Sequence, residues 1–281
     1  MKDNITIDFA LTWAKGQLKD AGIPNTKDAE FILAEIIKTN VADFRLRDTL
    51  TSKQVKMYDR AILKRCKHVP LDKIVGYTDF MDIRIPFSKH TLTPRQETEI
   101  MVDDIVRVYK GKKPSVLDLC SGSGCIGIAI AKELNTQVTL SDISKKANKV
   151  ATKNAKLNGV NVNIIHSDLF DNIPTKFDII ISNPPYIKRK DLKGLEIEVR
   201  DFDPRISLDG GDDGLDFYRE IIDKAPSYLN DGGMLYLEIG IDQSKDIEEM
   251  LNKDFEDVVV KKDYAKIDRY IIAKKRDKNV K

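Results

Sequence analysis

The sequence Ser115-Val116-Leu117-Asp118-Leu119-Cys120-Ser121-Gly122-Ser123-Gly124-Cys125-Ile126-Gly127 decides the fold. Its first five residues form a short, mostly apolar run typical of a strand, and the glycine-rich turn that follows opens a helix. Glycines at this position let a ligand approach the backbone closely. The segment therefore predicts a strand, a ligand-binding turn and a helix in succession.

Beyond this turn, short β-branched runs continue to alternate with helical segments. They are Gln137–Leu140, Asn163–His166, Phe177–Ser182 and Met234–Ile239. Such alternation indicates a mostly parallel sheet with helices on both faces. The last two runs, Asp257–Lys261 and Arg269–Ala273, lie too close together for a helical crossover, so we expect an antiparallel hairpin at one edge. The predicted fold is α/β, with a doubly wound, mostly parallel, seven-stranded sheet.

The first third of the chain has helical periodicity instead. Thr6 precedes a segment with apolar residues at helical spacing, and Thr51 with Gln54 forms a capping-box pattern before another. From Lys73 to Phe87 the period changes to two, which suggests a hairpin. We therefore predict a small all-α N-terminal domain over residues 1–72, a β-hairpin linker over 73–90 and the sheet domain over 91–281.

Thr93-Pro94-Arg95-Gln96 predicts the start of the first helix of the sheet domain. Threonine suits the cap, proline the first helical position and glutamine the third. Arg95 has no role in such a cap, so we expect it to face the ligand.

Composition excludes several classes of protein. The 47 basic and 45 acidic side chains of the 281 residues give a net charge of +2, so no global field attracts nucleic acid or a membrane surface. The start of the sequence, Met1-Lys2-Asp3-Asn4-Ile5-Thr6, has no leader pattern, and no window approaches the apolar length of a membrane span. The three cysteines have no metal-ligand spacing. We expect a cytoplasmic protein with reduced thiols and no metal site.

Acidic residues end three of the predicted strands. They are Asp118, Asp142 and Asp168, and in a doubly wound sheet the carboxyl ends of these strands line one crevice. The glycine turn by itself fits either NAD or S-adenosyl-L-methionine, because Gly122-x-Gly124-x-x-Gly127 is also a dinucleotide pattern. Carboxylates near a pyrophosphate cost electrostatic energy, whereas a sulfonium cofactor with an ammonium group favours them. Methyl transfer is therefore the preferred prediction over hydride transfer.

The next predicted strand ends in Asn183-Pro184-Pro185-Tyr186. Two prolines remove two backbone donors, leaving carbonyls and one carboxamide to face the ligand. The Asn183 side-chain oxygen and the Pro184 carbonyl can accept the two N–H bonds of a planar NH2 group and orient its lone pair. Tyr186 can pack its ring on such a group. The tetrapeptide alone leaves adenine and glutamine open as the methyl acceptor.

Together with other segments, the tetrapeptide closely resembles the release-factor glutamine methyltransferase family over nearly the whole chain. The matching segments are Pro70–Gly76, Thr93–Glu99, Asp118–Gly124, Asn183–Ile187, Asp203–Arg205, Leu208–Leu215 and Leu237–Gly240. This sequence has Cys120 and Gln96 where the family usually has glycine and proline. We expect the cysteine to require an ordinary backbone conformation there, which affects only the local shape of the loop.

The resemblance implies a Rossmann-like class I methyltransferase that is dependent on S-adenosyl-L-methionine and releases S-adenosyl-L-homocysteine. It implies that the methyl group goes to the side-chain amide nitrogen of the glutamine in the Gly-Gly-Gln motif of class 1 peptide chain release factors, which modulates translation termination. The helical N-terminal domain would recognise the release factor, and the enzyme would work as a monomer, without direct contact with nucleic acid or membrane.

Carried over by position, the family's site residues fall into two groups. The implied cofactor-binding residues are Asp118, Cys120, Ser121, Gly122, Ser123, Gly124, Asp142, Asp168, Leu169 and Asn183. Asn183, Pro184, Pro185 and Tyr186 would bind the glutamine, and Asn183, Pro184 and Tyr186 are the predicted catalytic residues.

Three other readings remain open at the level of sequence. The substrate can be the glutamine of a ribosomal protein, because the chemistry at the tetrapeptide would be the same. A nucleic-acid adenine methyltransferase would need a basic surface, which the near-neutral charge disfavours. A binding module that keeps the cofactor only for structure is disfavoured by the intact Asn183-Pro184-Pro185-Tyr186.

Overall fold

The computed structural model describes residues 5–277 and divides the chain into two compact units. The helical unit contains residues up to Tyr77 and the later segment Glu196–Phe202, and the sheet unit contains Thr78–Leu195 and the residues from Asp203 onward. Sequence analysis did not predict that residues 196–202 group with the helices. The first four residues of the start segment considered above, and residues 278–281, lie outside the described part.

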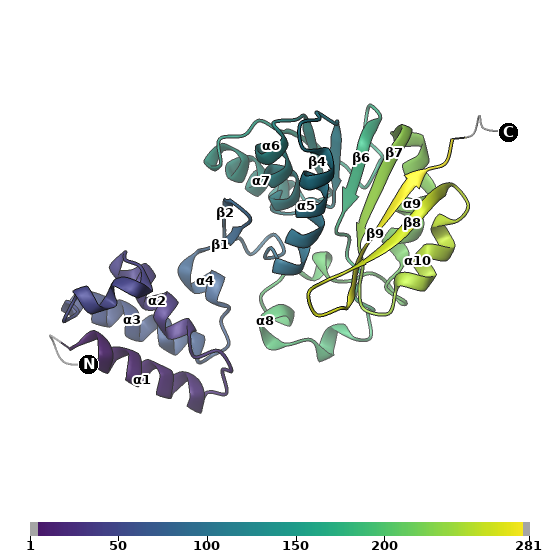
Figure 1. Cartoon of the computed structure of the whole chain (residues 1–281). Coiled ribbons are helices and arrows are strands. Elements are labelled where there is room, and N and C mark those ends of the chain that lie inside the picture. Colours follow the sequence, from purple (N-terminus) through teal and green to yellow (C-terminus); the bar gives the residue numbers. More distant parts are fainter. Residues whose placement is uncertain (1–4, 278–281) are drawn as a thin grey trace. The chain divides into compact units, whose positions relative to one another are not determined.

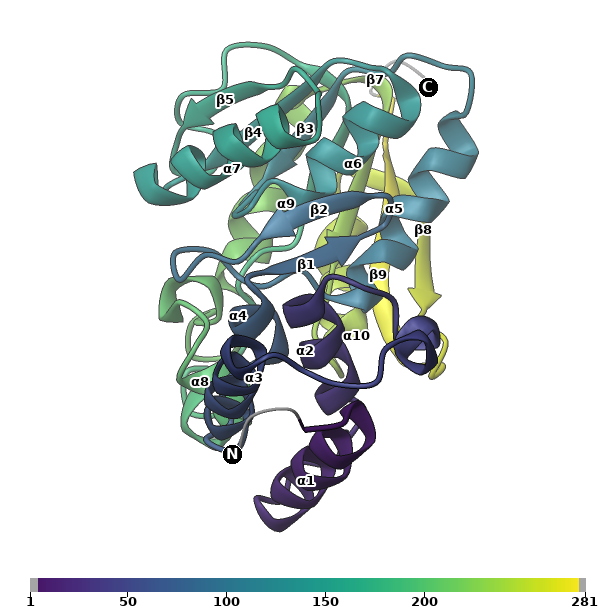
Figure 2. The same cartoon turned by 90° about the vertical axis from the view of Figure 1, so that its left-hand side faces the viewer.

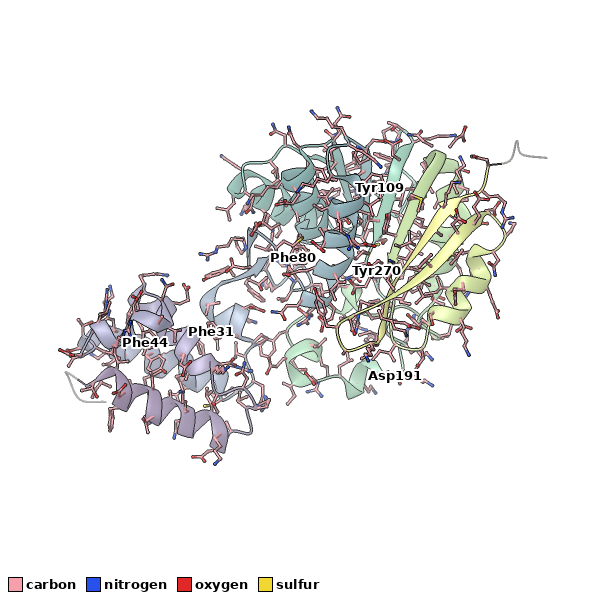
Figure 3. The ribbon with its side chains drawn as sticks, viewed as in Figure 1. Phe31, Phe44, Phe80, Tyr109, Asp191 and Tyr270 are labelled. Atoms are coloured by element: carbon pink, nitrogen blue, oxygen red, sulfur yellow. The ribbon has the colours of Figure 1, made fainter. Side chains whose placement is uncertain are left out.

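The helical unit begins as its caps predict. The Thr6 hydroxyl accepts a hydrogen bond from the Phe9 amide at 3.2 Å, and Thr51 with Gln54 forms the complete capping box, which confirms both predicted helix starts. The elements of this unit are α1 (Ile7–Asp20), α2 (Asp28–Ile37), η1 (Val41–Leu46), α3 (Ser52–Arg65), α4 (Leu71–Val75) and α8 (Ile197–Arg200). The inner faces of α1, α2 and α3 form one hydrophobic core, which includes Phe44 of η1, labelled in Figure 3.

A buried ion-pair network holds the returning segment within the helical unit. Nε of Arg65 donates to Asp28 Oδ2 at 2.6 Å, and Arg65 Nη1 lies 2.8 Å from Glu198 Oε1 in α8. The Arg65 side chain is only 6% exposed. Because a buried charge is costly without partners, this guanidinium depends on both carboxylates.

The sheet unit contains the predicted doubly wound sheet, and the fold class is confirmed. The strands are β3 (Val116–Leu119), β4 (Val138–Asp142), β5 (Asn163–His166), β6 (Phe177–Ser182), β7 (Leu229–Glu238), β8 (Phe255–Lys262) and β9 (Asp268–Lys275). Their order is β5-β4-β3-β6-β7-β9-β8, parallel from β5 to β7 and antiparallel in the final hairpin. The chain order therefore reverses between β3 and β6, which is the position where such sheets bind ligands.

Helices cover both faces of this sheet (Figures 1 and 2). One core joins α5 (Gln96–Tyr109), α6 (Cys125–Leu134) and α7 (Lys145–Leu157) to one face, and a second joins α9 (Asp216–Tyr228) and α10 (Ser244–Leu251) to the other. Alternate residues of β3 divide between the cores, since Val116 belongs to the first, and Leu117 and Leu119 to the second.

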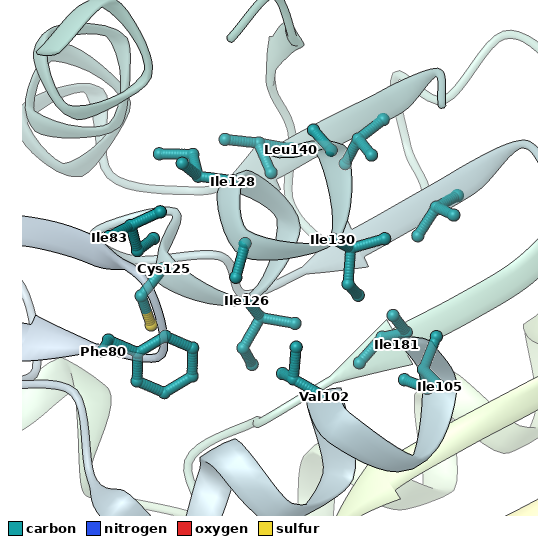
Figure 4. Packing of buried hydrophobic residues seen from close by; sticks show 14 of the residues in the cluster. Phe80, Ile83, Val102, Ile105, Cys125, Ile126, Ile128, Ile130, Leu140 and Ile181 are labelled. Atoms are coloured by element: carbon teal, nitrogen blue, oxygen red, sulfur yellow. The ribbon is translucent and has the colours of Figure 1, made fainter. Parts of the chain in front are cut away.

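The predicted hairpin forms from β1 (Tyr77–Phe80) and β2 (Ile83–Pro86). Its residues Phe80 and Ile83 belong to the first core, and Figure 4 shows them beside Cys125 of α6. The period-two reading began too early, because Lys73–Val75 close the short helix α4 instead. Gly76 ends that helix in the left-handed conformation at φ 92°.

The predicted cap at Thr93 is wrong. Helix α5 begins at Gln96, and the Thr93 backbone amide and hydroxyl both donate to Asp203 Oδ1, at 3.4 and 3.3 Å. Asp203 also pairs with Arg95 at 2.6 Å. The Thr93 hydroxyl therefore bonds to Asp203, which is remote in sequence, and does not cap the helix.

The short 3₁₀ helices η2 (Leu192–Gly194) and η3 (Arg205–Ser207) lie in the connection between β6 and α9. None of the helices within residues 5–277 has the length and apolar character that crossing a bilayer would require.

The Arg65 network predicts a large loss of stability when one carboxylate is removed. We expect Asp28→Ala to destabilise the helical unit by about 3 kcal/mol, because the guanidinium would stay buried with an incomplete set of partners. Urea unfolding of the full chain, followed by the fluorescence of its single tryptophan, measures this, since Trp13 packs edge-on against Tyr58 in the same unit.

Lys15→Ala is the matched control. It removes a partly exposed pair with Glu30 in the same unit and should cost less than about 1 kcal/mol. Equal unfolding midpoints for Asp28→Ala and Lys15→Ala would contradict the assigned role of the buried network.

Candidate active site at the sheet edge

A cavity of about 730 Å³ opens in the sheet unit at the carboxyl ends of β3, β4 and β6. Most of the predicted site residues line it. They are Cys120, Ser121, Gly122, Ser123, Asp142, Asp168, Leu169, Asn183 and Pro185. Asp118, Gly124, Pro184 and Tyr186 are not among the lining residues. The fold therefore brings the glycine turn and the tetrapeptide to one cavity.

The glycine turn forms the floor of this cavity. Its Gly122 amide donates to Asp142 Oδ2 at 2.8 Å, so the ends of β3 and β4 are joined. Gly124 has φ 79°, and a Cβ there would lie 2.9 Å from Leu140 Cδ1. Any larger residue at this position would be strained and would press on the core.

The expected conformation of Cys120 is wrong. Its φ is 57°, in the left-handed region that a residue with a Cβ adopts only at a cost of about 1–2 kcal/mol. The cysteine thus takes the conformation for which glycine is suited. Burial raises the pKa of its thiol to about 12, with Asp142 adding to the rise, so the group stays protonated.

Asp118 lies beneath the floor, fully buried. Its Oδ2 accepts a hydrogen bond from the Gly127 amide at 2.9 Å, while Oδ1 has no hydrogen-bond partner among the described residues. Burial raises the pKa of this carboxyl to about 7, and the charge of Asp142 adds to the rise. Asp118 therefore does not reach the cavity surface. Its incompletely paired carboxyl group lies behind the glycine turn, two residues before Cys120, the first turn residue that lines the cavity.

Asp142 and two serines supply the polar groups of the wall. Asp142 accepts from the Gly122 amide and, through Oδ1, from the Ser144 amide at 2.7 Å, and burial raises its pKa. The hydroxyl oxygens of Ser121 and Ser141, both lining residues, have no hydrogen-bond partner within residues 5–277. Because buried polar groups normally find partners, these two hydroxyls are available to a polar ligand in the cavity.

Asn183 and Pro185 line the same cavity from the loop that follows β6. The ring of Tyr186 instead packs into the second core, and a Cβ on Gly240 would lie 3.0 Å from its Cδ2. Burial raises the Tyr186 pKa, so its hydroxyl stays protonated. Within the described residues, Tyr186 therefore anchors the tetrapeptide in the second core and does not line the cavity.

The backbone of the tetrapeptide is held from behind by a glycine-rich loop. Ile187 donates to the Leu208 carbonyl, and the Gly210 amide donates to the Ile187 carbonyl, both at 2.9 Å. A Cβ on Gly210 would approach the Tyr186 Cα to 2.7 Å, which explains the glycine. Gln243 adds a clamp, because its Nε2 donates to the Tyr186 carbonyl at 3.1 Å.

Residue-by-residue reasoning missed Gln243, Gly210 and the buried Glu238, which ends β7 next to the tetrapeptide. Gly210 lies in the segment Leu208–Leu215 and Glu238 in Leu237–Gly240, which the family resemblance included without giving a role, whereas Gln243 lies in neither. Within the described residues, no group of three or more His, Cys, Asp or Glu side chains is arranged to hold a metal ion.

The buried Asp118 predicts a specific dependence of stability on pH. Its pKa is raised in the folded protein, so its contribution to stability is fully present below the unfolded value near 3.9 and is lost as pH rises through about 7. We expect Asp118→Asn to be more stable than wild type at pH 8, by up to about 4 kcal/mol, and to lose this advantage at pH 4.

Urea unfolding of the ligand-free protein, followed by circular dichroism from pH 4 to 8, tests this. Asp223→Asn, at an exposed position in α9, should leave the pH dependence unchanged. A constant difference between Asp118→Asn and wild type across the pH range would contradict the shifted titration.

Comparison with known families agrees with this architecture. The family model described as "Methyltransferase small domain" matches residues 87–198, and the one described as "PrmC N-terminal domain" matches residues 10–76. The first match covers β3 to β6 and so includes both the glycine turn and the tetrapeptide.

Solved structures share the fold of the sheet unit. A methyltransferase from Pyrococcus furiosus is similar with a TM-score of 0.54 and 18% identity, over 77% of this chain and 96% of that one. A ribosomal protein L11 methylase from Lactobacillus delbrueckii has a TM-score of 0.50 and 22% identity, over 65% and 81%. At these identities the likeness concerns the fold alone.

Curated relatives match much more closely and over almost the whole chain. A protein named release factor glutamine methyltransferase from Fusobacterium nucleatum is 38% identical over 92% of this chain and 76% of its own length. Another protein of that name, from Geobacter sulfurreducens, is 35% identical over 95% of both chains. The chain therefore belongs to the release factor glutamine methyltransferase family.

Proposed function

We propose that this protein transfers a methyl group from S-adenosyl-L-methionine to the side-chain amide nitrogen of the glutamine in the Gly-Gly-Gln motif of class 1 peptide chain release factors. The observation that carries the proposal is that Asn183 opens into the same cavity as the glycine turn and Asp142. A group that orients an NH2 and a site that suits a cationic cofactor are thus side by side. Family membership supports the choice of substrate.

The cavity residues fit this cofactor. Asp142 would accept hydrogen bonds from the ribose hydroxyls, and Asp168 would accept one from the adenine amino group. The backbone of the turn from Cys120 to Gly124 would run along the cofactor. The hydroxyls of Ser121 and Ser141 are available to its polar groups. When the Asp118 carboxyl, with its pKa raised to about 7, is ionised, it adds negative charge behind the turn, which would favour a cation in the cavity. When bound, S-adenosyl-L-methionine supplies a methyl group on a positively charged sulfur and becomes neutral S-adenosyl-L-homocysteine.

The tetrapeptide would prepare the glutamine amide for reaction. Asn183 Oδ1 would accept a hydrogen bond from one N–H of this amide, and the carbonyl of Pro184, next in the chain but not itself a lining residue, would accept from the other, which would direct the nitrogen lone pair toward the methyl carbon. Transfer would exchange the cofactor's C–S bond for the new N–C bond, and the methylated nitrogen would release one proton to water. The protein acts through orientation and electrostatics, so a strong general base is not needed.

The protein substrate requires a recognition surface outside the cavity. We assign it to the helical unit, which matches the PrmC N-terminal domain and exposes the large apolar side chains of Phe9, Phe31 and Leu46. The near-neutral net charge supports a protein partner over nucleic acid. Such an enzyme would work in the cytoplasm, where release factors are, and as a monomer.

Replacing the carboxamide tests the catalytic proposal. We expect Asn183→Ala to lower the rate of methyl transfer to a release factor at least about 100-fold, because one of the two oriented acceptors is lost. The dissociation constant for S-adenosyl-L-methionine, measured by calorimetry, should change less than about 3-fold. Asn161→Ala, on an exposed loop of the same unit, is the control and should keep wild-type turnover. Near-normal turnover of Asn183→Ala would refute the role of Asn183.

A second experiment tests the substrate. Purified release factors with Gly-Gly-Gln and with Gly-Gly-Ala are incubated with the protein and cofactor labelled in the methyl group. We expect label only in the first, and peptide mass spectrometry should find it on the glutamine amide. Equal labelling of both, or transfer only to a ribosomal protein, would overturn the assignment.

A further inference from the structure

Glu238 is a buried acidic residue beside the tetrapeptide. Glu238 ends β7 and is 2% exposed. The parallel register pairs Leu237 with Ser182, so Glu238 stands beside Asn183 at the next position along both strands. Thr98 Oγ1 donates to its Oε2 at 2.6 Å, and the neighbouring Asn183 carboxamide lowers the pKa of its carboxyl.

The backbone at Glu238 is fixed on two sides. The Tyr218 hydroxyl donates to its carbonyl at 2.7 Å, and its neighbour Ile239 donates to the Arg269 carbonyl at 2.9 Å. Residue 238 also pairs with Tyr270 in the antiparallel ladder. The carboxylate is therefore presented to Asn183 by a rigid frame of β7, β9 and α9.

An ionised carboxylate only accepts hydrogen bonds. A bond from Asn183, its neighbour in the register, would therefore use the carboxamide NH2 group as the donor and leave Oδ1 on the opposite side of the planar amide. Asn183 lines the cavity, so the side turned away from Glu238 is the side available to a substrate.

We propose that Glu238 is a positioning residue, which together with Thr98 holds the NH2 group of Asn183 so that Oδ1 faces the cavity and accepts from the reacting amide. This inference rests on the proposed function and deepens it, because it states what determines which end of the Asn183 carboxamide meets the substrate. It also gives a role to Thr98 in the segment Thr93–Glu99, where local sequence suggests only the beginning of a helix.

Protonation of Glu238 would reverse the arrangement. A neutral carboxyl can donate to Asn183 Oδ1, and the carboxamide would then present its NH2 group to the NH2 group of the substrate, donor against donor. Burial raises the Glu238 pKa to about 7, the bonds from Thr98 and Asn183 and the charge of Arg269 oppose the rise, and Glu97 adds to it. The nearby Tyr186 hydroxyl stays protonated. The rate of methyl transfer should therefore fall as pH is lowered through this range.

The first test observes the hydrogen bond in the protein without cofactor or substrate. The side-chain NH2 resonances of Asn183 are assigned in asparagine-labelled protein by their absence from Asn183→Ala. We expect them to exchange slowly with solvent and to titrate with a midpoint near 7 in wild type. In Glu238→Gln the titration should disappear. A pH-independent Asn183 resonance in wild type would overturn the inference whatever the enzyme methylates.

The second test measures single-turnover methyl transfer to a release factor at saturating cofactor between pH 5.5 and 9. Saturation separates this profile from any effect of Asp118 on cofactor binding. We expect Glu238→Gln to lower the rate at pH 8 by at least about 10-fold, to leave the cofactor dissociation constant within about 3-fold, and to flatten the acid limb. Wild-type rate and profile in this variant would overturn the inference.

Thr98 provides a milder and matched pair of variants. Thr98→Val removes a donor that favours the ionised carboxylate, so the midpoint of the acid limb should move to higher pH, and Thr98→Ser should restore it. A loss of stability alone would lower the rate without moving the midpoint. If Thr98→Val folds and the midpoint of its acid limb does not move, the inference is contradicted. This outcome can be read even if Glu238→Gln does not fold. If wild type methylates no glutamine while the Asn183 resonance titrates, the proposed function fails and the hydrogen bond stands.

Discussion

The structure of the site depends on the reversal of strand order between β3 and β6. Both strands are parallel neighbours, but the chain leaves β3 toward β4 and leaves β6 toward β7. The loops after them therefore diverge and leave a cavity between them. The glycine turn follows β3, and Asn183-Pro184-Pro185-Tyr186 follows β6. The strand order of the sheet therefore brings the cofactor side and the acceptor side together.

The acceptor side is held by a second layer of contacts. The loop of Gly210 and Gly214, the clamp of Gln243 and the carboxylate of Glu238 all act on the tetrapeptide from outside the cavity. Catalysis by orientation requires such support, because an amide free to rotate would spend much of its time in unproductive positions. On the cofactor side, the left-handed backbone of Cys120 and the burial of the Asp118 carboxyl each lower the stability of the fold. The shape and charge of the turn depend on these two features.

Local patterns in the sequence predicted the fold well where the decisive interaction is local. The capping box at Thr51 needs only Gln54, three residues on, and the strand pattern of Phe177–Ser182 needs only its own apolar residues. The same reasoning failed at Thr93, because its hydroxyl is taken by Asp203, 110 residues away. Lys73–Val75 followed a helix signal beginning at Pro70 rather than the period of the hairpin that comes after it.

Neighbouring residues were enough to specify the α/β architecture, the glycine turn and the tetrapeptide, because each follows from the periodicity or stereochemistry of a few adjacent positions. The sequence also carried the family resemblance. Long-range packing established that Pro184 and Tyr186 do not line the cavity, that Cys120 adopts a left-handed conformation, and that Glu238 accepts from Thr98 beside Asn183. These outcomes depend on burial and on contacts between residues that lie 55 to 140 positions apart in the sequence. Sheet register and packing set such contacts, and no local pattern encodes them.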